Sequence, residues 1–574
     1  MVSPNLAKHS EDDRPVEISG DAKKLFQIIY SEKNKKEEID EDIPKIKVST
    51  LISRVAFFYE KVRNAVDYEE EHLLRKNAIA RILRRQIVIE GVVLETDGPQ
   101  IANHLLVELI RGSYLSNNTI PETKISEIAG LLEKYIRLKN KIAAKINIEL
   151  NLKTDINKAK DLIGEKNKLI HWLLNLAACE IEENLAPNLI KQTIVDDLFS
   201  VLQKNIKLPA DLPYEADLEI QIYLSIDRTF LKFDADMLSF VLFKYYNPDW
   251  VGISSQEELS GAEDAKIEAI ASHVLSLRDR IDAQLAHPLI QQLDKIVRVY
   301  ALYFSILSET IESDPAKVYS ELQKGEKSFV ALIRKVCNKK YLKAKSRLWR
   351  AALRGIIYIF LTKSIFVILI EAPAIKFFNE PLDPVSLAIN IAFPAALLFF
   401  IVFLTRTPRD NNTDKIVSGI KEIAFAGNEK KQPIVLRRRF RRNWLKDGVF
   451  HLIYIASFCF SVFVVIWALD KVNFNWVSII IFLFFLAFVS FFSVLTTKGV
   501  KELIIVERRE NLFTFLLDLF YMPIILVGRW LSGEFAKINV FIFLFDFIIE
   551  APFKVLVEIM EDWTKYVRER RDNI

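Results

Sequence analysis

Glycine is scarce in this sequence. The chain of 574 residues contains 16 glycines, whereas an average protein contains roughly 7% glycine. Few glycines leave few positions for turns with a positive φ and for loops that cradle a phosphate group. The low glycine content therefore favours an all-α fold and argues against a glycine-rich phosphate-binding loop.

Cysteine is scarcer still, and no secretion signal is visible. Cys179, Cys337 and Cys459 stand far apart and form no CxxC pair, which excludes a disulfide framework and a cysteine-based zinc site. We expect free thiols in a reducing compartment. The N-terminal sequence MVSPNLAKHSEDDRPVEIS lacks the basic and then apolar order of a signal peptide. We therefore expect the first large part of the chain to stay on the side of the membrane where it is made.

The common motifs of catalysis and cofactor binding are missing. The sequence contains no HExxH, GxxxxGK(S/T), GxGxxG or GxSxG, and its seven histidines never stand at metal-ligand spacing. His171 and Cys179 would lie near one face of a helix, but a partly buried pair in a helical core explains them. We therefore predict no enzyme activity, no catalytic residues, no cofactor and no metal.

Apolar and charged residues are unevenly distributed along the chain. Hydrophobic residues make up 51% and charged residues 26% of it; the long apolar runs follow residue 350, and most of the charge precedes it. Residues 1–45 are polar and predict a flexible tail with at most a short helix at DAKKLFQIIYSEK. Residues 46–345 carry apolar side chains at intervals of three and four, which predicts a large helical cytoplasmic domain.

The stretch DLEIQIYLSID fits two structures. Its apolar residues alternate as in a strand, but Ile222, Ile226 and Phe230 continue at helical spacing. We favour a hairpin of two helices, of which the second begins after Asp234 as its N-cap and ends before Pro248.

Four runs are long and apolar enough to cross a bilayer core, which takes about 20 helical residues. They are residues 355–373, 385–404, 449–469 and 476–496, within a membrane region of residues 346–500. Lysine and arginine crowd the stretch before the first run and the loop of residues 405–448, whereas the two remaining loops contain one lysine each. The positive-inside bias predicts that both basic stretches are cytoplasmic. We expect a multi-pass protein of a bacterial inner membrane with both termini cytoplasmic.

The C-terminal portion, residues 501–574, fits two arrangements. The stretches NLFTFLLDLFYMPIILVGRWL and INVFIFLFDFIIEAPFKVLVEIM are apolar, but Asp518, Asp546 and Glu550 interrupt them. They form either two further spans or two amphipathic helices in the interface. The charged tail WTKYVRERRDNI is cytoplasmic in both arrangements.

Basic residues beside the apolar runs are candidate contacts for anionic lipid headgroups, to which each cation near the surface contributes about 1 kcal/mol. Aromatic residues are interleaved with them, Trp349 in the first stretch and Phe440 and Trp444 in the second. Because membrane sequence flanks both stretches, we expect no nucleic-acid binding. The candidates are Lys339, Lys340, Lys343, Lys345, Arg347, Arg350, Arg437, Arg438, Arg439, Arg441 and Arg442.

Two charged residues lie in the first apolar run, Lys363 in its interior and Glu371 near its predicted outer end. A charge at this depth indicates a partner or a water path, but snorkelling, or packing of Lys363 beside Glu371 or Asp518, explains it equally. The tetrapeptide IEAP ends this run and recurs at residues 549–552. Because proline disfavours continuation of a helix, we interpret both copies as helix ends.

Three longer phrases resemble known sequences. ACEIEENLAP, RTFLKFDADMLSFVLFKYYNPDW and VGRWLSGEFAKINVFIFLFDFIIEAPFK are similar to phrases of uncharacterised multi-pass membrane proteins of candidate-phylum (Patescibacteria-type) bacteria. The resemblance covers most of the chain from residue 160 onward. It implies an integral membrane protein and assigns neither an activity nor site residues.

Three classes of function remain open. The first is a non-enzymatic membrane-anchored scaffold, whose helical cytoplasmic domain docks a protein partner or a second copy of the chain. The large soluble portion without a catalytic set favours it. The second is a channel or transporter component that uses the C-terminal apolar segments with Lys363, Asp518 and Asp546. The third, a membrane enzyme acting on lipid, has the least support.

Overall fold

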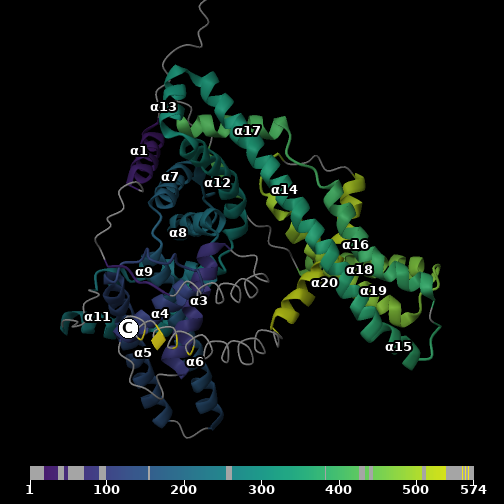
Figure 1. Ribbon diagram of the computed structural model, residues 1–574, viewed down its shortest axis with the longest axis horizontal. Helices are drawn as coiled ribbons and strands as arrows, with labels where there is room; N and C mark the ends of the chain where they lie inside the picture. Colours follow the sequence, from purple (N-terminus) through teal and green to yellow (C-terminus); the bar gives the residue numbers. More distant parts are fainter. Residues whose placement is uncertain are drawn as a thin grey trace, which may run out of the picture. The chain divides into compact units, whose positions relative to one another are not determined.

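Helices make up nearly all of the described chain, as the sequence predicts (Figure 1). The computed structural model describes residues 19–35, 44–48, 70–89, 98–152, 156–253, 261–381, 383–425, 433–437, 444–506 and 512–537, with five further residues between 559 and 570. Within these ranges the only sheet pairs β1 (Ile206–Lys207) with β2 (Ile434–Val435) in parallel. The all-α prediction is confirmed, with this short pairing as an addition.

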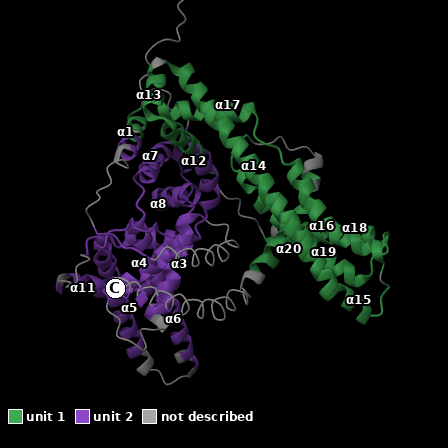
Figure 2. Ribbon diagram, in the orientation of Figure 1, with its two compact units in different colours: residues 1–26, 302–431, 437–546 green, residues 27–301, 432–436, 547–574 purple. Residues whose placement is uncertain are grey.

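The chain divides into two compact units (Figure 2). Unit 1 comprises residues 1–26, 302–431 and 437–546, and unit 2 comprises residues 27–301, 432–436 and 547–574. This division differs from the predicted boundaries at residues 45 and 345. The described residues at the start of the chain, 19–26, and the segment from residue 302 belong to unit 1.

Unit 2 is a helical body with its own hydrophobic core. Its buried side chains come mainly from α3, α4, α5, α6, α9 and α11, whose apolar residues recur at helical spacing. The elements are α3 (Glu71–Arg84), η1 (Arg85–Ile89), α4 (Gly98–Arg111), α5 (Thr123–Leu152), α6 (Ile156–Leu185), α7 (Leu189–Asn205), α8 (Glu215–Ile226), η3 (Asp227–Leu231), α9 (Ala235–Tyr246), α10 (Pro248–Val251) and α11 (Gly261–Leu285), followed by α12 (Ile290–Ser313), which leads into unit 1.

The predicted hairpin of helices is confirmed at α8 and α9. The alternating stretch is helical throughout α8. The Asp234 carboxylate accepts a hydrogen bond from the backbone N–H of Met237 at 3.0 Å and so caps α9. The helix ends at Tyr246, directly before Asn247 and Pro248.

Unit 1 begins with part of α1 (Gly20–Lys35), where a short helix was predicted. This segment is tied down: Ser19 donates a hydrogen bond to the Ile423 carbonyl at 2.7 Å, and the Phe26 ring meets that of Tyr319 edge-on at 5.8 Å. The other elements are α13 (Pro315–Lys324), α14 (Glu326–Phe366), η4 (Val367–Glu371), α15 (Ala372–Phe377), α16 (Pro384–Leu404), α17 (Asp410–Ala424), α18 (Trp444–Asp470), α19 (Trp476–Lys501) and α20 (Leu512–Lys537).

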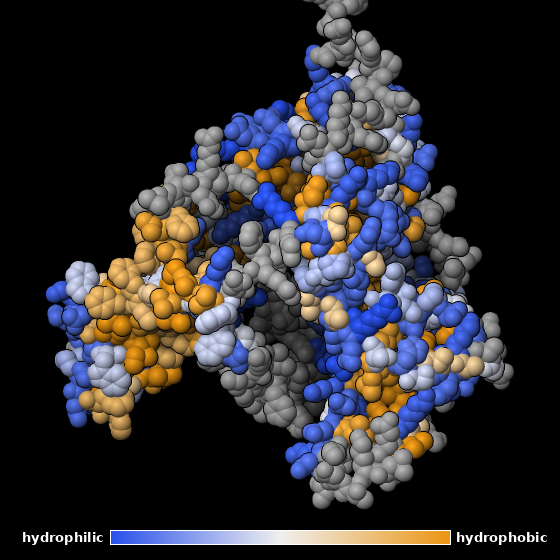
Figure 3. Space-filling model, turned by 180° about the vertical axis from the view of Figure 1, so that it is seen from behind, coloured by the Kyte–Doolittle hydropathy of each residue, from blue (hydrophilic) through white to orange (hydrophobic). Residues whose placement is uncertain are grey.

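Within the described residues, four helical segments of unit 1 are long and apolar enough to cross a membrane, and they contain the four predicted runs. The segments are Glu326–Phe377, Pro384–Leu404, Trp444–Asp470 and Trp476–Lys501. Large apolar side chains on α15, α16, α18 and α19 face outward and cover this part of the surface (Figure 3). A contiguous apolar surface of this kind is typical of contact with lipid.

The helix end predicted at the first IEAP copy is wrong. The chain continues from α14 through the π-helical turn η4 into α15, past Pro373. In η4 the N–H of Ala372 donates to the carbonyl of Val367, five residues earlier. This wider turn lets the helix pass a proline that lacks a backbone donor. The second copy lies outside the described residues.

Helix α20 packs on α18 and α19. Ser457 Oγ donates to the Leu519 carbonyl at 2.8 Å, and Ser461 Oγ donates to the Phe520 carbonyl at 3.0 Å. At Gly528 the approach to α19 is so close that a Cβ atom would lie 2.0 Å from the carbonyl oxygen of Ala487. The first C-terminal apolar stretch therefore lies against two of the candidate spans.

Asn412 joins three segments of unit 1. Its side-chain N–H groups donate to the Tyr341 hydroxyl at 3.0 Å and to the Leu503 carbonyl at 2.8 Å, and its oxygen accepts from the N–H of Ile505 at 2.8 Å. The residue is buried. It thereby fixes α14, α17 and the segment after α19 to one another.

Candidate binding cavity and intramembrane charge cluster

Unit 2 contains a cavity of about 950 Å³. Residues of α3, α6, α7, α8, η3 and α9 line it. Ligand sites in proteins usually have volumes of roughly 300–1,000 Å³ and a few polar groups among apolar walls. The cavity is therefore large enough for a small molecule or for a few residues of a peptide.

Asp227 is the most deeply buried acid in the cavity wall. Asp227 is 2% exposed, and its Oδ2 atom has no hydrogen-bond partner. It is the first residue of the π-helical turn η3, which ends at Leu231 and is followed by Lys232 in the left-handed conformation (φ 63°). Such turns are frequent at functional sites because they displace a side chain from the regular helical face.

Burial raises the pKa of Asp227 from 3.8 to about 7, because water is excluded from the carboxylate. The charge of Lys244 opposes this rise most strongly, Glu183 adds to it, and Arg228 opposes it weakly. Near neutral pH the side chain therefore changes readily between its acid and its carboxylate form.

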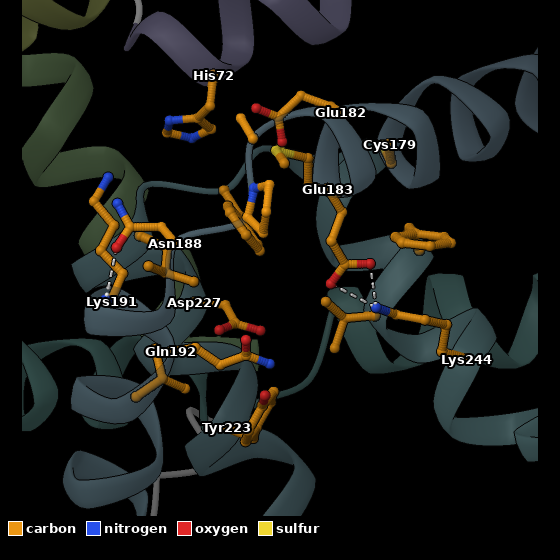
Figure 4. A pocket seen from close by; sticks show the side chains of 18 of the residues that line it. His72, Cys179, Glu182, Glu183, Asn188, Lys191, Gln192, Tyr223, Asp227 and Lys244 are labelled. Carbon is orange, nitrogen blue, oxygen red and sulfur yellow. Dashed lines mark hydrogen bonds and ion pairs between the residues drawn. The ribbon is translucent and has the colours of Figure 1, made fainter. Parts of the chain in front are cut away.

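Two of the three cations that line the cavity, Lys244 and Arg75, are held by other acids. Lys244 Nζ lies 2.9 and 2.7 Å from the two carboxylate oxygens of Glu183, and Arg75 Nη2 lies 2.8 Å from Glu182 Oε1. Figure 4 shows the Asp227 carboxylate between Asn188 and Gln192 on one side and Glu183 on the other. Neither ion pair includes Asp227, whose Oδ2 has no hydrogen-bond partner.

Aromatic side chains form part of the wall near Asp227. The rings of Phe199 and Tyr223 meet edge-on with centroids 5.8 Å apart, and burial, together with the Asp227 charge, raises the pKa of Tyr223. Tyr245 lines the cavity but is 57% exposed. The wall therefore contains aromatic rings both near the buried acid and at an exposed position.

His72 forms another part of the wall and carries no charge there. Burial lowers its pKa, and the Lys191 charge lowers it further, so the ring is neutral at neutral pH. Within the described residues, no three His, Cys, Asp or Glu side chains gather in a way that could hold a metal ion.

A second buried polar cluster lies among the apolar helices of unit 1. The side chains of Lys363 and Glu371 are both 0% exposed, with Nζ 3.4 Å from Oε2. The other carboxylate oxygen accepts hydrogen bonds from Asn390 Nδ2 at 2.5 Å and from Ser478 Oγ at 2.6 Å. The ammonium group also lies 4.1 Å from the ring centre of Phe485.

The predicted intramembrane residues therefore have different fates. Lys363 and Glu371 are brought together, as in the packing alternative. Asp518 lies on α20 with its side chain exposed, so it is not Lys363's partner. Asp546 and Glu550 lie outside the described residues. The wider turn η4 places Glu371 facing inward.

The candidate lipid contacts on α14 are mostly exposed, namely Lys339, Lys343, Lys345, Arg347 and Arg350. Lys340 differs from them because it forms an ion pair with Glu309 at 2.9 Å and donates to Ser305 Oγ at 2.9 Å. Arg437 is exposed, and Arg438, Arg439, Arg441 and Arg442 lie outside the described residues.

Sequence reasoning missed Asp227, Asn390 and Ser478. Each could have been noticed in the sequence as a polar residue at or within an apolar run. Asp227 directly follows the apolar residues of α8, and Asn390 and Ser478 lie inside two of the predicted spans. The sequence pattern does not reveal which of them meet in space.

A comparison of the chain with protein-family models, curated proteins and solved structures finds no match.

Proposed function

We propose that the protein is a non-enzymatic membrane-anchored binding protein. Unit 1 holds the chain in the membrane through its apolar helices, and unit 2 binds a partner at its cavity. The cavity carries this proposal, because it joins a buried unmatched acid to an exposed aromatic rim within a body that has its own core. The partner is a protein segment or small molecule that enters beside Tyr245.

The placement of the parts belongs to the same proposal. The basic stretches face the cytoplasm and contact anionic headgroups, and unit 2 is cytoplasmic with them. The exposed lysines and arginines of α14 support a cytoplasmic placement of the first basic stretch. The packing of α20 on α18 and α19 supports a further membrane helix rather than an interfacial one.

Conduction is the alternative function, and the charge cluster does not favour it. Lys363 and Glu371 neutralise each other, and Asn390 and Ser478 saturate the remaining carboxylate oxygen. A buried polar group with satisfied partners fixes the packing of helices. Asp518, which a conduction path was expected to include, is exposed on α20.

Site-specific photo-crosslinking of the full chain in its native membrane tests the proposal. A photoreactive residue at Tyr245 is expected to give one dominant adduct, and the same residue at Leu275, an exposed position of α11 outside the cavity wall, is expected not to. Val241→Trp, which fills the cavity from α9, should abolish the Tyr245 adduct. Equal labelling at both positions, or solute flux through liposomes that contain the purified chain, would refute it.

A further inference from the structure

We propose that the cavity of unit 2 binds its ligand through a protonated amino group that pairs with Asp227, while an apolar or aromatic body lies against Phe199 and Tyr223. This inference rests on the proposed function and names the chemistry of its ligand. It concerns an organic ammonium group, carried either by a free amine or by the N-terminus of a peptide.

Asp227 is an acceptor without a donor. Its Oδ2 atom is buried and makes no hydrogen bond. A buried polar atom of this kind is costly, and in native structures it calls for a partner such as a water, an ion or a ligand group. In Figure 4 no hydrogen bond or ion pair is drawn to the Asp227 carboxylate from the residues shown around it.

The nearest cation of the wall is engaged elsewhere. Both oxygens of Glu183 hold Lys244, which also lies over the Phe240 ring at 4.5 Å. Arg75, another cation that lines the cavity, contacts both Glu182 and Glu71. An incoming ammonium group therefore meets Asp227 without having to displace either pair.

The charge of the wall selects a cation. Six acids line the cavity against three lysines and arginines, and the one histidine is neutral. Such an excess repels carboxylates and phosphates and raises the local concentration of cations. A ligand that is itself an acid would bring a further negative charge into this field.

The rings beside Asp227 suit the rest of such a ligand. The Phe199 and Tyr223 rings present both apolar area and π-electron density, which attracts an ammonium group within about 6 Å of a ring centre. The volume of about 950 Å³ leaves room for an aromatic body together with its ammonium head. A cation on an apolar body satisfies the acid and the rings at the same time.

Binding of a matched series of small molecules to the full chain in lipid nanodiscs tests this inference. The probe is 2-phenylethylammonium; 2-phenylethanol and phenylacetate keep the ring and replace the cation by a neutral group or an anion. We expect the ammonium probe to bind at least tenfold more tightly than either analogue. Equal binding of phenylacetate would overturn the inference.

Two variants provide the matched comparison. Asp227→Asn should weaken the ammonium probe at least tenfold, whereas Asp279→Asn, the same change at an exposed acid of α11 outside the cavity wall, should alter it less than threefold. Unchanged melting of unit 2 in both variants shows that they fold. Undiminished binding to Asp227→Asn would refute the assignment of this residue.

A peptide arm separates the two sources of the ammonium group. A phenylalanyl-glycyl-glycine amide with a free N-terminus should bind and its N-acetylated form should not if a peptide terminus is the ligand; preference for the small amine identifies a free amine. If none of the amines binds but Tyr245 still gives its specific adduct, the proposed function stands and the ammonium inference fails. If the adduct is absent as well, both fail.

Discussion

Removing the charges of the Lys363–Glu371 pair one at a time should destabilise unit 1, whereas removing both should not. At 3.4 Å the attraction is about 5 kcal/mol with an effective dielectric constant of about 20. Glu371→Gln keeps an oxygen for the donors of Asn390 and Ser478 but leaves an uncompensated buried ammonium. We expect a loss of about 3–5 kcal/mol from the free energy of unfolding.

Lys363→Met combined with Glu371→Gln removes both charges and keeps that oxygen, so its stability should return to within about 1–2 kcal/mol of the native chain. Unfolding of the full chain in mixed micelles by increasing detergent fraction measures this cycle. The pair of exposed Lys498 and half-buried Glu502, at 3.9 Å, is the control and should contribute less than about 1 kcal/mol. A double variant as unstable as Glu371→Gln alone would refute the reasoning.

Three further predictions concern packing and charge. Gly528→Ala should lower the melting temperature of unit 1, because the added methyl group overlaps the Ala487 carbonyl at a cost of about 1–3 kcal/mol or more. Gly533→Ala is the control and should leave the melting temperature unchanged, because the space around Gly533 is open. Equal effects of the two variants would contradict the close contact. Asn412→Ala should cost about 1–3 kcal/mol and expose residues 503–506 to protease; an unchanged digestion pattern would count against its role. As pH rises from about 4 to 7, the unfolded chain loses the Asp227 proton before the folded chain does, because the pKa of Asp227 in the folded chain is about 7. The stability of the native chain relative to Asp227→Asn should therefore fall by on the order of 4 kcal/mol over this range. Melting of both proteins as a function of pH measures this difference, and parallel curves would disprove it.

The sequence predicts the helices well because their signals are local. The spacing of apolar residues identifies α8 despite its alternating stretch, and the Asp234 side chain marks the start of α9. The same reasoning locates the apolar runs, since about 20 apolar residues are a property of one segment. Elements that depend on a single stretch of chain are thus readable without a structure.

The sites are not local, and here sequence reasoning reaches only part of the answer. Lys363 and Glu371 are recognisable as charges in an apolar run, but Ser478, more than 100 residues later, completes the cluster. The helix end predicted before Pro373 fails because the π-helical turn absorbs the missing donor, and no propensity of the IEAP residues announces such a turn. Asp227 likewise could not be recognised as a site residue from the sequence, because its role depends on the absence of a hydrogen-bond partner for Oδ2 in the folded structure.

The uninterrupted course of α14 has a mechanical consequence. Its 41 residues extend about 60 Å at 1.5 Å per residue, and one continuous ladder of hydrogen bonds joins the exposed basic half to the apolar half. A helix without a break bends little over such a length, so the two halves share one axis and one rotational setting. A change in the headgroups that the basic half contacts would tilt this half of α14. Because the helix is stiff, the apolar half would then tilt by the same angle.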